Sequence, residues 1–417
     1  MTLCDDRPVT GGEGTNRRLG SALRIAADGS YAARLVAADS HGRQWLTERW
    51  TLDGPEPYAV RLPAGRPEEP GSEVLPLPDG RVLIRRPAQG GHRFVLLYPT
   101  GPGTGELPLG RIPQPAAGSP AAPGLPLRRA VGHPVLLPPP PDASQRAYAL
   151  VSGEVSVVWQ VCGSTRGPEP VAEVPGWCSG GVWLDRAGRL LALDRTDRRG
   201  RTKTVVVNLA RGAEVTPLLE LTETSRDRLL LADPDSGLVL VRSDAAGEER
   251  LGWGVLDRHR PVCFPRSLHP AGLRLTPFAV QPGQTLQPES CAVAFRVDGP
   301  RGTWVAVWRP AGLASDAPGG GAQRELRHLP APEGWLPGTG LWTAQGELRL
   351  PCSTPQLPCG LARLTPPEPP RVSAAKRRVR IAAALEGASA ALAERLATSP
   401  RRPVPLQHAP LAGAASA

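Results

Sequence analysis

The sequence predicts an all-β protein: a β-propeller of seven blades, followed by a C-terminal helical tail. Glycine and proline, the residues that punctuate turns, number 47 and 50 among 417 residues and occur along the whole chain, which favours many short strands. A pattern of turn, strand, loop and second strand also recurs. Its glycines Gly29 and Gly346 are 317 positions apart, or six steps of about 53 residues. This period fits seven blades, although six or eight would fit nearly as well.

The copies of this repeat follow one another along the chain. Each begins with a turn that contains Asp or Gly and continues with an apolar strand, as in PDGRVLI at 78–84. The spacing of the glycines requires a further, degenerate copy between residues 130 and 175, where RAYALVSGEVSVVWQVCG at 146–163 supplies the strands. The recognisable copies lie at residues 27–54, 78–105, 181–219, 225–257, 291–312 and 340–366.

The strands within the copies have the pattern of sheets that are buried on both faces. VVVNL at 205–209 is largely apolar and β-branched. In TWVAVWRP, Trp304 and Trp308 are expected on one side of a strand, with Val305 and Val307 on the other. One copy makes a sheet too small to be stable alone. Stacking the copies radially buries both faces and leaves only short edges, which is the architecture of a propeller.

The copy at 181–219 holds the most regular set of turn and strand residues. They are Trp183, Asp185, Gly188, Leu191, Asp194, Gly200, Val205, Val207 and Gly212. This set resembles the blade repeat of TolB-type, WD40-like propellers, which also forms the propeller of prolyl-oligopeptidase-like peptidases. It departs from that repeat by an extra residue in the turn and by Asn208 where Asp is usual. The resemblance extends over about residues 20–366 and implies a propeller fold.

The peptidase activity of the similar family is not expected here. The sequence has no G-x-S-x-G nucleophile motif, and the chain after the last blade is too short for a hydrolase domain. Trp183 and Trp342 are interpreted as packing between blades, with the alternative that they line a ligand-binding mouth. The residues interpreted as turn formers are Asp185, Gly188, Asp194 and Gly200.

Other segments lie outside the repeat. Residues 1–20 are predicted to form an N-terminal arm, and residues 21–366 the propeller. The Pro-rich stretches 112–129 and 137–142 are predicted to be surface loops. Residues 258–289 are predicted to be a long connection that either lines a binding site or only decorates the fold.

The tail at 367–417 is predicted to hold one amphipathic helix, over about residues 373–398. Its apolar residues, including Ala388, are spaced by three or four positions and form one stripe, and basic residues precede that stripe. Such a helix docks on the protein's own body, binds a partner, or contacts nucleic acid or an anionic membrane. The candidate partner-binding residues are Ile381, Leu385, Leu392, Leu396, Lys376, Arg377, Arg378 and Arg380.

The net charge of +10 is concentrated in this tail, and the rest of the chain is nearer to balance. Arginine is abundant and lysine is rare, as expected of a GC-rich bacterial genome, so nucleic-acid binding is not predicted. The seven cysteines are dispersed without a C-x-x-C motif, which favours a reducing compartment. The N-terminus lacks the apolar segment of an export signal, and no stretch is long enough to cross a membrane. We therefore expect a cytoplasmic, monomeric propeller.

No local motif predicts a cofactor or a metal. The acidic stretch DPDSG at 233–237 lacks a third carboxylate at calcium-loop spacing and is interpreted as a hairpin turn. His259, Cys263 and His269 are weak candidates for zinc ligands, with Asp257 as a fourth, but their spacing matches no closed zinc motif. We therefore predict no cofactor and no bound metal.

The leading hypothesis for function is a non-catalytic propeller scaffold that binds a protein or peptide partner. It depends on a repeat scaffold without a local catalytic motif. The alternative is a propeller enzyme, a hydrolase or lyase, with a site at the mouth of the central channel. An enzyme would bring two or more His, Asp or Glu side chains within hydrogen-bond reach at the axis, with perturbed pKa values.

Overall fold

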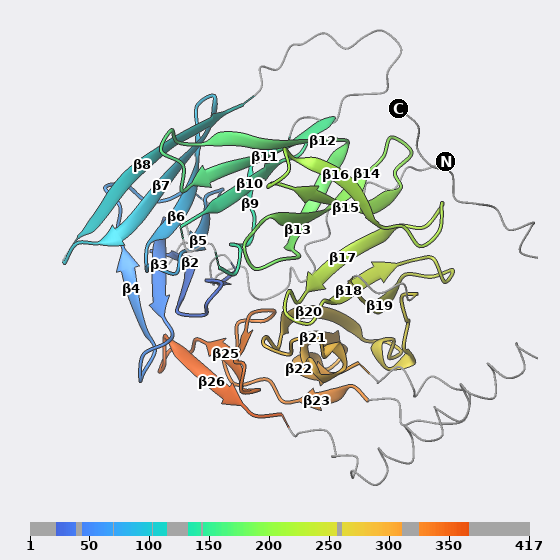
Figure 1. The fold of residues 1–417 in the computed structure, drawn as a ribbon. Coiled ribbons are helices and arrows are strands. Elements are labelled where there is room, and N and C mark those ends of the chain that lie inside the picture. Colours follow the sequence, from blue (N-terminus) through green and yellow to red (C-terminus); the bar gives the residue numbers. More distant parts are fainter. Residues whose placement is uncertain are drawn as a thin grey trace, which may run out of the picture. The chain divides into compact units, whose positions relative to one another are not determined.

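A computed structural model shows a seven-bladed β-propeller, which confirms the predicted fold class (Figure 1). Twenty-six strands form seven antiparallel sheets, and each sheet uses strands that are consecutive in sequence. Among the described residues, the helical elements are two 3-10 turns, η1 (Arg266–Leu268) and η2 (Pro288–Ser290). The structure describes residues 22–38, 44–69, 71–101, 103–114, 132–142, 145–256, 261–310 and 325–366.

Each blade begins with a strand near the axis of the propeller and ends with a strand at its periphery (Figure 1). Blade 1 holds β1 (Arg24–Ile25), β2 (Tyr31–Ala37), β3 (Trp45–Thr51) and β4 (Tyr58–Leu62). Blade 2 holds β5 (Glu73–Pro76), β6 (Val82–Ala88), β7 (Gly91–Pro99) and β8 (Thr104–Pro113). Blade 3 holds β9 (Val135–Leu136), β10 (Ala147–Val151), β11 (Val155–Cys162) and β12 (Glu169–Pro175), where the degenerate copy was predicted.

The remaining blades follow the same order. Blade 4 holds β13 (Trp177–Trp183), β14 (Leu190–Thr196), β15 (Thr202–Asn208) and β16 (Glu214–Leu219). Blade 5 holds β17 (Asp227–Ala232), β18 (Leu238–Ser243) and β19 (Arg250–Val255). Blade 6 holds β20 (Arg274–Val280), β21 (Val293–Gly299), β22 (Gly302–Trp308) and β23 (Arg327–Leu329). Blade 7 holds β24 (Leu341–Trp342), β25 (Leu348–Cys352) and β26 (Gly360–Leu364).

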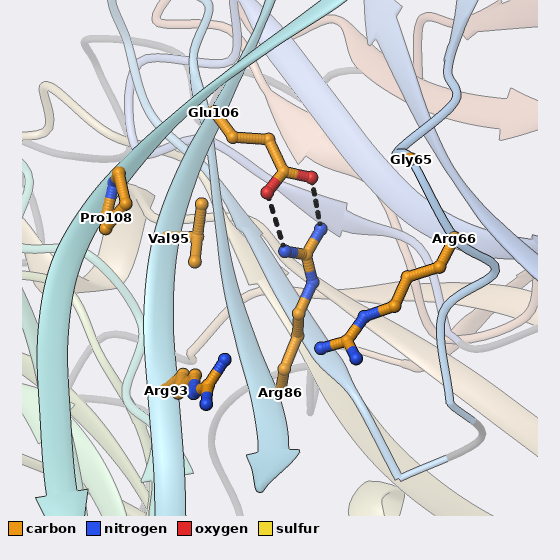
Figure 2. A pocket seen from close by; sticks show the side chains of 7 residues that line it. All are labelled: Gly65, Arg66, Arg86, Arg93, Val95, Glu106 and Pro108. Atoms are coloured by element: carbon orange, nitrogen blue, oxygen red, sulfur yellow. Dashed lines mark hydrogen bonds and ion pairs between the residues drawn. The ribbon is translucent and has the colours of Figure 1, made fainter.

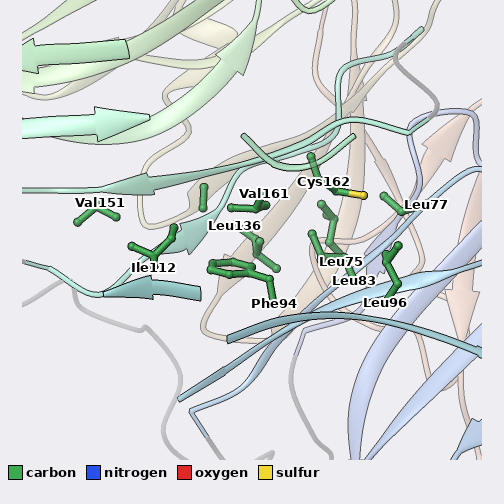
Figure 3. Close-up of a cluster of buried hydrophobic side chains, with 12 residues drawn as sticks. Leu75, Leu77, Leu83, Phe94, Leu96, Ile112, Leu136, Val151, Val161 and Cys162 are labelled. Carbon is green, nitrogen blue, oxygen red and sulfur yellow. The ribbon is translucent and has the colours of Figure 1, made fainter. Parts of the chain in front are cut away.

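Apolar layers between neighbouring blades make up the core. Between blades 2 and 3, Leu83 and Phe94 pack with Leu136 and Val161, and all four side chains are buried (Figure 3). Burying one such side chain contributes about 1.5–3 kcal/mol, so these layers hold the sheets together.

Strand β22 shows that a single strand serves two of these layers. Trp304 and Trp308 pack in the layer shared by blades 5 and 6, while Val305 and Val307 pack in the layer shared by blades 6 and 7. The predicted division of this strand into two apolar faces is confirmed.

The turn glycines of the repeat are required for two reasons. Gly80 and Gly188 have φ angles of +82° and +69°, in the left-handed region that favours glycine. A Cβ at Gly188 would lie 2.7 Å from Pro140 of blade 3, and one at Gly80 would lie 3.1 Å from Tyr31 of blade 1. Gly200 also has a positive φ, +79°, but it faces open space. The first-turn glycines of blades 2 and 4 therefore touch the preceding blade, whereas Gly200 in the second turn of blade 4 does not.

The tryptophans at the start of the blades are packing residues, as predicted. Trp183 is 5% exposed, and its ring lies 5.2 Å from the ring of Tyr148 in blade 3. Its indole Nε1 donates to the carbonyl of Pro138 at 2.7 Å. Trp342 is buried in the layer between blades 6 and 7.

The prediction that Asp194 forms a turn is wrong. Asp194 lies within β14, and its Oδ1 accepts hydrogen bonds from the hydroxyl of Thr204 at 2.9 Å and from the amide of Leu229 at 3.1 Å. Leu229 belongs to blade 5, so this carboxyl links two blades. The turn residue is Asp197, whose carboxylate accepts from the amides of Arg199 and Arg201.

The stretch at 258–289 is largely part of the propeller and not an inserted connection. Residues 274–280 form β20, the inner strand of blade 6. Cys263 pairs with Trp253 of β19 at the outer edge of blade 5. Pro140, in a stretch predicted to be a surface loop, is buried against the turn of blade 4. A prediction from composition assigns Pro-rich stretches to surface loops, so it missed the residues of these stretches that are buried.

The circle of blades closes by side-chain packing between blade 7 and blade 1. Trp50 of β3 and Leu52, which follows this strand, pack with Cys359 and Leu361 of the last blade. Among the described residues, no strand is shared between these two sheets. The predicted N-terminal arm at 1–20 and the predicted tail at 367–417 lie outside the described residues.

Candidate binding site

The first strand of each blade lies near the axis of the propeller, and ionisable groups gather where the first strand of blade 2 begins (Figure 1). Glu73 at the start of β5 forms ion pairs with Arg24 of blade 1 and Arg85 of blade 2. Its Oε2 also accepts from the amide of Leu136 in blade 3 at 3.0 Å. This carboxylate therefore joins three blades, and its acceptor positions are occupied by structural partners.

Two histidines lie near this group. Nη1 of Arg85 donates to Nδ1 of His92 at 2.9 Å, and the ring of His133 lies 6.3 Å from that of His92. Burial, together with the charges of Arg85 and His133, lowers the pKa of His92 to about 4. The guanidinium that stands between Glu73 and His92 is always protonated and only donates. These residues therefore do not form a direct acid–base pair.

A pocket of about 520 Å³ lies on the outer part of the groove between blades 1 and 2 (Figure 2). Three arginines line it. One comes from the loop after β4, and two come from β6 and β7, which are neighbouring strands of blade 2. The lining residues are Gly65, Arg66, Arg86, Arg93, Val95, Glu106 and Pro108.

Arg86 is the fixed element of this pocket. Its guanidinium bonds to Glu68 at 2.5 and 2.8 Å and to Glu106 at 3.0 Å through two nitrogens. Burial alone would lower the pKa of Arg86, but the hydrogen bonds that it donates to both carboxylates outweigh burial and raise the pKa. Arg86 and Glu68 are 8% and 5% exposed, so the pair is held away from solvent. A bidentate arrangement of this kind sets the orientation of the guanidinium plane.

Arg66 and Arg93 differ from Arg86 because no ion pair joins them to any residue that the structure describes. Both are exposed, and their guanidinium groups point toward the space beside Arg86 (Figure 2). Arg86, and to a smaller extent Arg66, lowers the pKa of the Glu106 carboxyl. The pocket therefore has one positive charge in excess, because three guanidinium groups stand beside the two carboxylates of Glu68 and Glu106.

This arrangement is suited to binding an anionic group. Guanidinium groups recognise carboxylates and phosphates through paired hydrogen bonds. Val95 and Pro108 supply an apolar wall against which the carbon chain of such a group can pack.

The site residues predicted from the sequence fall elsewhere. Ile381, Leu385, Leu392 and Leu396, with the basic residues 376–380, lie outside the described part of the chain.

Of the weak zinc candidates, His259 also lies outside the described residues. Cys263 and His269 are both half-buried, and burial lowers the pKa of His269. Within the described ranges, no three His, Cys, Asp or Glu side chains come together as a metal site.

The arginine pocket was missed by sequence reasoning. Arg86 and Arg93 are direct partners in the pairing of β6 with β7, a relation that the repeat could have indicated. Arg66 and Glu68 come from the preceding blade, and only the docking of two blades brings them to Arg86. The abundance of arginine along the chain also concealed this local group.

Comparisons with known proteins support the fold alone. No family model and no curated protein matches the chain, whereas many solved structures do. A puromycin-hydrolyzing peptidase of Mycobacterium tuberculosis is 15% identical with a TM-score of 0.49, over 84% of this chain and 51% of that one. The β-propeller domain of the Trilobed protease from Pyrococcus furiosus is 11% identical with a TM-score of 0.47, over 84% and 96%. A putative TolB from Agrobacterium tumefaciens is 14% identical with a TM-score of 0.35, over 75% and 91%.

These similar structures include TolB and peptidase propellers, as the resemblance in sequence implied. The chain spans about half the length of the mycobacterial peptidase. No helix among the described residues is long and apolar enough to cross a membrane.

Proposed function

We propose that the protein is a non-catalytic propeller scaffold that binds a protein or peptide partner, and that an acidic side chain of this partner enters the pocket between blades 1 and 2. The observation that supports this most is the presence of two exposed guanidinium groups, Arg66 and Arg93, beside the fixed ion pairs of Arg86. A carboxylate entering there could accept charge-assisted hydrogen bonds from Arg66 and Arg93. We keep a cytoplasmic location as part of this proposal, because the dispersed cysteines favour it.

Selection of peptides from a random display library on the immobilised protein tests this proposal. Selected peptides should be enriched in Asp and Glu. Their affinity should fall at least about tenfold for the double variant Arg66→Gln/Arg93→Gln, since two charge-assisted contacts are removed. Arg363→Gln serves as the matched control, because Arg363 is an exposed arginine on β26 of blade 7.

Two results would contradict the proposal. Peptides without acidic enrichment would show that the pocket does not select a carboxylate. Equal binding of acidic peptides to the wild type and the double variant would place their site elsewhere on the protein.

A further inference from the structure

Two carboxylates share the guanidinium of Arg86, and each holds a different edge of it. Glu68 accepts from Nε at 2.8 Å and from Nη2 at 2.5 Å. Glu106 accepts from the two terminal nitrogens, Nη1 and Nη2, both at 3.0 Å (Figure 2). Both contacts are bidentate, but the one with Glu106 is longer and therefore looser.

The two carboxylates also differ in exposure. The side chain of Glu68 is 3% exposed, and its backbone amide donates to the carbonyl of Trp45 in blade 1, which fixes the residue in place. The side chain of Glu106 is 35% exposed and projects from β8, the outermost strand of blade 2. Solvent screens an ion pair that is exposed to this extent, so its net contribution is small. Glu68 is therefore a structural partner of Arg86, whereas Glu106 can be exchanged.

The edge of Arg86 that Glu106 holds is open to the pocket between blades 1 and 2. Arg93 is the direct partner of Arg86 in the pairing of β6 with β7, and Glu106 is the direct partner of Leu97 in the pairing of β7 with β8. Arg93 and Leu97 are four positions apart, so all four side chains stand on one face of blade 2. Both members of the ion pair line the pocket. A carboxylate that enters the pocket therefore approaches the nitrogens that Glu106 holds.

We propose that Glu106 is an internal ligand of Arg86 that the carboxylate of the partner displaces. This inference rests on the function proposed for the pocket. One carboxylate replaces another on the terminal nitrogens, so the hydrogen bonds of Arg86 are kept while Glu106 turns to solvent. The entering carboxylate also gains contacts with Arg66 and Arg93, which line the same pocket. A neutral amide does not replace a carboxylate on a guanidinium, so Glu106 also makes the pocket selective for acids.

The substitution Glu106→Asp separates displacement from a simple change of charge. Aspartate keeps the negative charge but is shorter by one methylene, so it should not hold both terminal nitrogens of Arg86 from its place on β8. The probe is N-acetylglutamate methylamide, which has one side-chain carboxylate between two amide groups. It is titrated at pH 7.5 and constant ionic strength, and binding is followed in the nuclear magnetic resonance spectrum of the protein. Glu106→Asp should bind the probe at least about threefold more tightly than the wild type, because the competing internal ion pair is weakened.

Two controls identify the origin of this gain. Glu347→Asp should bind the probe as the wild type does, because Glu347 pairs with Arg349 on blade 7 and its side chain is 27% exposed. Arg86→Lys keeps the charge but loses the two terminal nitrogens, so Glu106→Asp should bring no gain in that background. Circular dichroism spectra check that each variant is folded.

The outcomes separate this inference from the proposed function. If Glu106→Asp and the wild type bind equally, and Arg66→Gln/Arg93→Gln weakens that binding, displacement is overturned while the proposed function stands. If neither the wild type nor Glu106→Asp binds the probe, both are contradicted. A gain that persists in the Arg86→Lys background also overturns displacement, since it would then come from the space left in the pocket.

Discussion

Replacing Asp194 by asparagine should remove the part of the pH dependence of the free energy of unfolding that the Asp194 carboxyl causes. Oδ1 of Asp194 accepts both of its hydrogen bonds, from Thr204 and from Leu229 of the next blade. An asparagine Oδ1 can accept the same two bonds. Asp194 is 6% exposed and has no ion-pair partner among the described residues, so the substitution changes mainly its ability to ionise.

The size and sign of the effect follow from the shift in pKa. Burial raises the pKa of Asp194 from 3.8 to about 6, against the hydrogen bonds of Leu229 and Thr204 and the charge of Arg228, which lower it. Each pKa unit corresponds to about 1.4 kcal/mol, so the shift corresponds to about 3 kcal/mol. Because the pKa is higher in the folded state, this stabilisation is fully present below pH 3.8 and is lost as the pH rises through about 6.

Chemical denaturation of the wild type and Asp194→Asn between pH 4 and pH 7.5 measures this directly. The difference in free energy of unfolding should move by about 2.5 kcal/mol in favour of the variant across that range, because a small part of the change occurs below pH 4. The amide nitrogen that replaces Oδ2 adds a buried donor, which costs about 1–3 kcal/mol if it is unpaired. That cost does not depend on pH. The test is therefore how the difference in free energy of unfolding between variant and wild type changes with pH, and not how large this difference is at one pH.

Asp197→Asn is the matched control, three residues along the same strand and turn. Its exposed carboxylate is a hydrogen-bond acceptor in the turn, and its pKa is lowered by the amide and side chain of Arg201 despite opposing desolvation. A lowered pKa contributes stability that is present above the unfolded value of 3.8 and is lost as the pH falls below it, so the difference between this variant and the wild type should stay nearly constant from pH 4 to pH 7.5. Parallel stability curves for the wild type and Asp194→Asn would refute the reasoning about Asp194.

Further expectations concern the turns, the pocket and the thiols. Gly188→Ala should lower the free energy of unfolding by more than about 2 kcal/mol, because the alanine would have a strained φ and would also overlap the neighbouring blade. Gly200→Ala should lower it by only about 1 kcal/mol, because only the strained φ applies. Equal losses for the two variants in urea denaturation would contradict this expectation. Arg86→Met should cost roughly 3–5 kcal/mol at pH 7, since it leaves the buried carboxylate of Glu68 unpaired, and a loss below 1 kcal/mol in the same assay would argue against a strong pair. Burial raises the pKa of Cys178 to about 11, so its thiol should react with a disulfide reagent at pH 8 only after unfolding, and rapid labelling of the folded protein would contradict its burial.

The fold could be predicted from the sequence because its signals are local. Positive-φ glycines mark the turns, and β-branched strands mark sheets buried on both faces, so each copy can be recognised without knowledge of the others. The error at Asp194 arose within this local pattern. The spacing D-x-x-G occurs at Asp185–Gly188 and again at Asp197–Gly200, and both are turns in the structure. Asp194 lies just before the second occurrence. The prediction placed it in that turn, although Asp194 lies in the strand.

The arginine pocket could not be predicted, because its geometry depends on the docking of two blades. Glu68 precedes Arg86 by 18 positions and lies in another repeat, so no periodic pattern relates them. Their contact depends on how blade 1 packs on blade 2, which is set by the apolar layer of Val74, Ile84 and their neighbours. A group of arginines in an arginine-rich chain has no compositional signal of its own.

Two carboxylates at the start of inner strands show what most charged side chains do in this fold. Glu73 is the first residue of β5, and Asp227 is the first residue of β17. The two acids are occupied by basic partners, and these contacts join neighbouring blades. Charged side chains whose partners belong to the fold therefore hold the propeller together, whereas Arg66 and Arg93, which form no ion pair with a described residue, are available to a ligand.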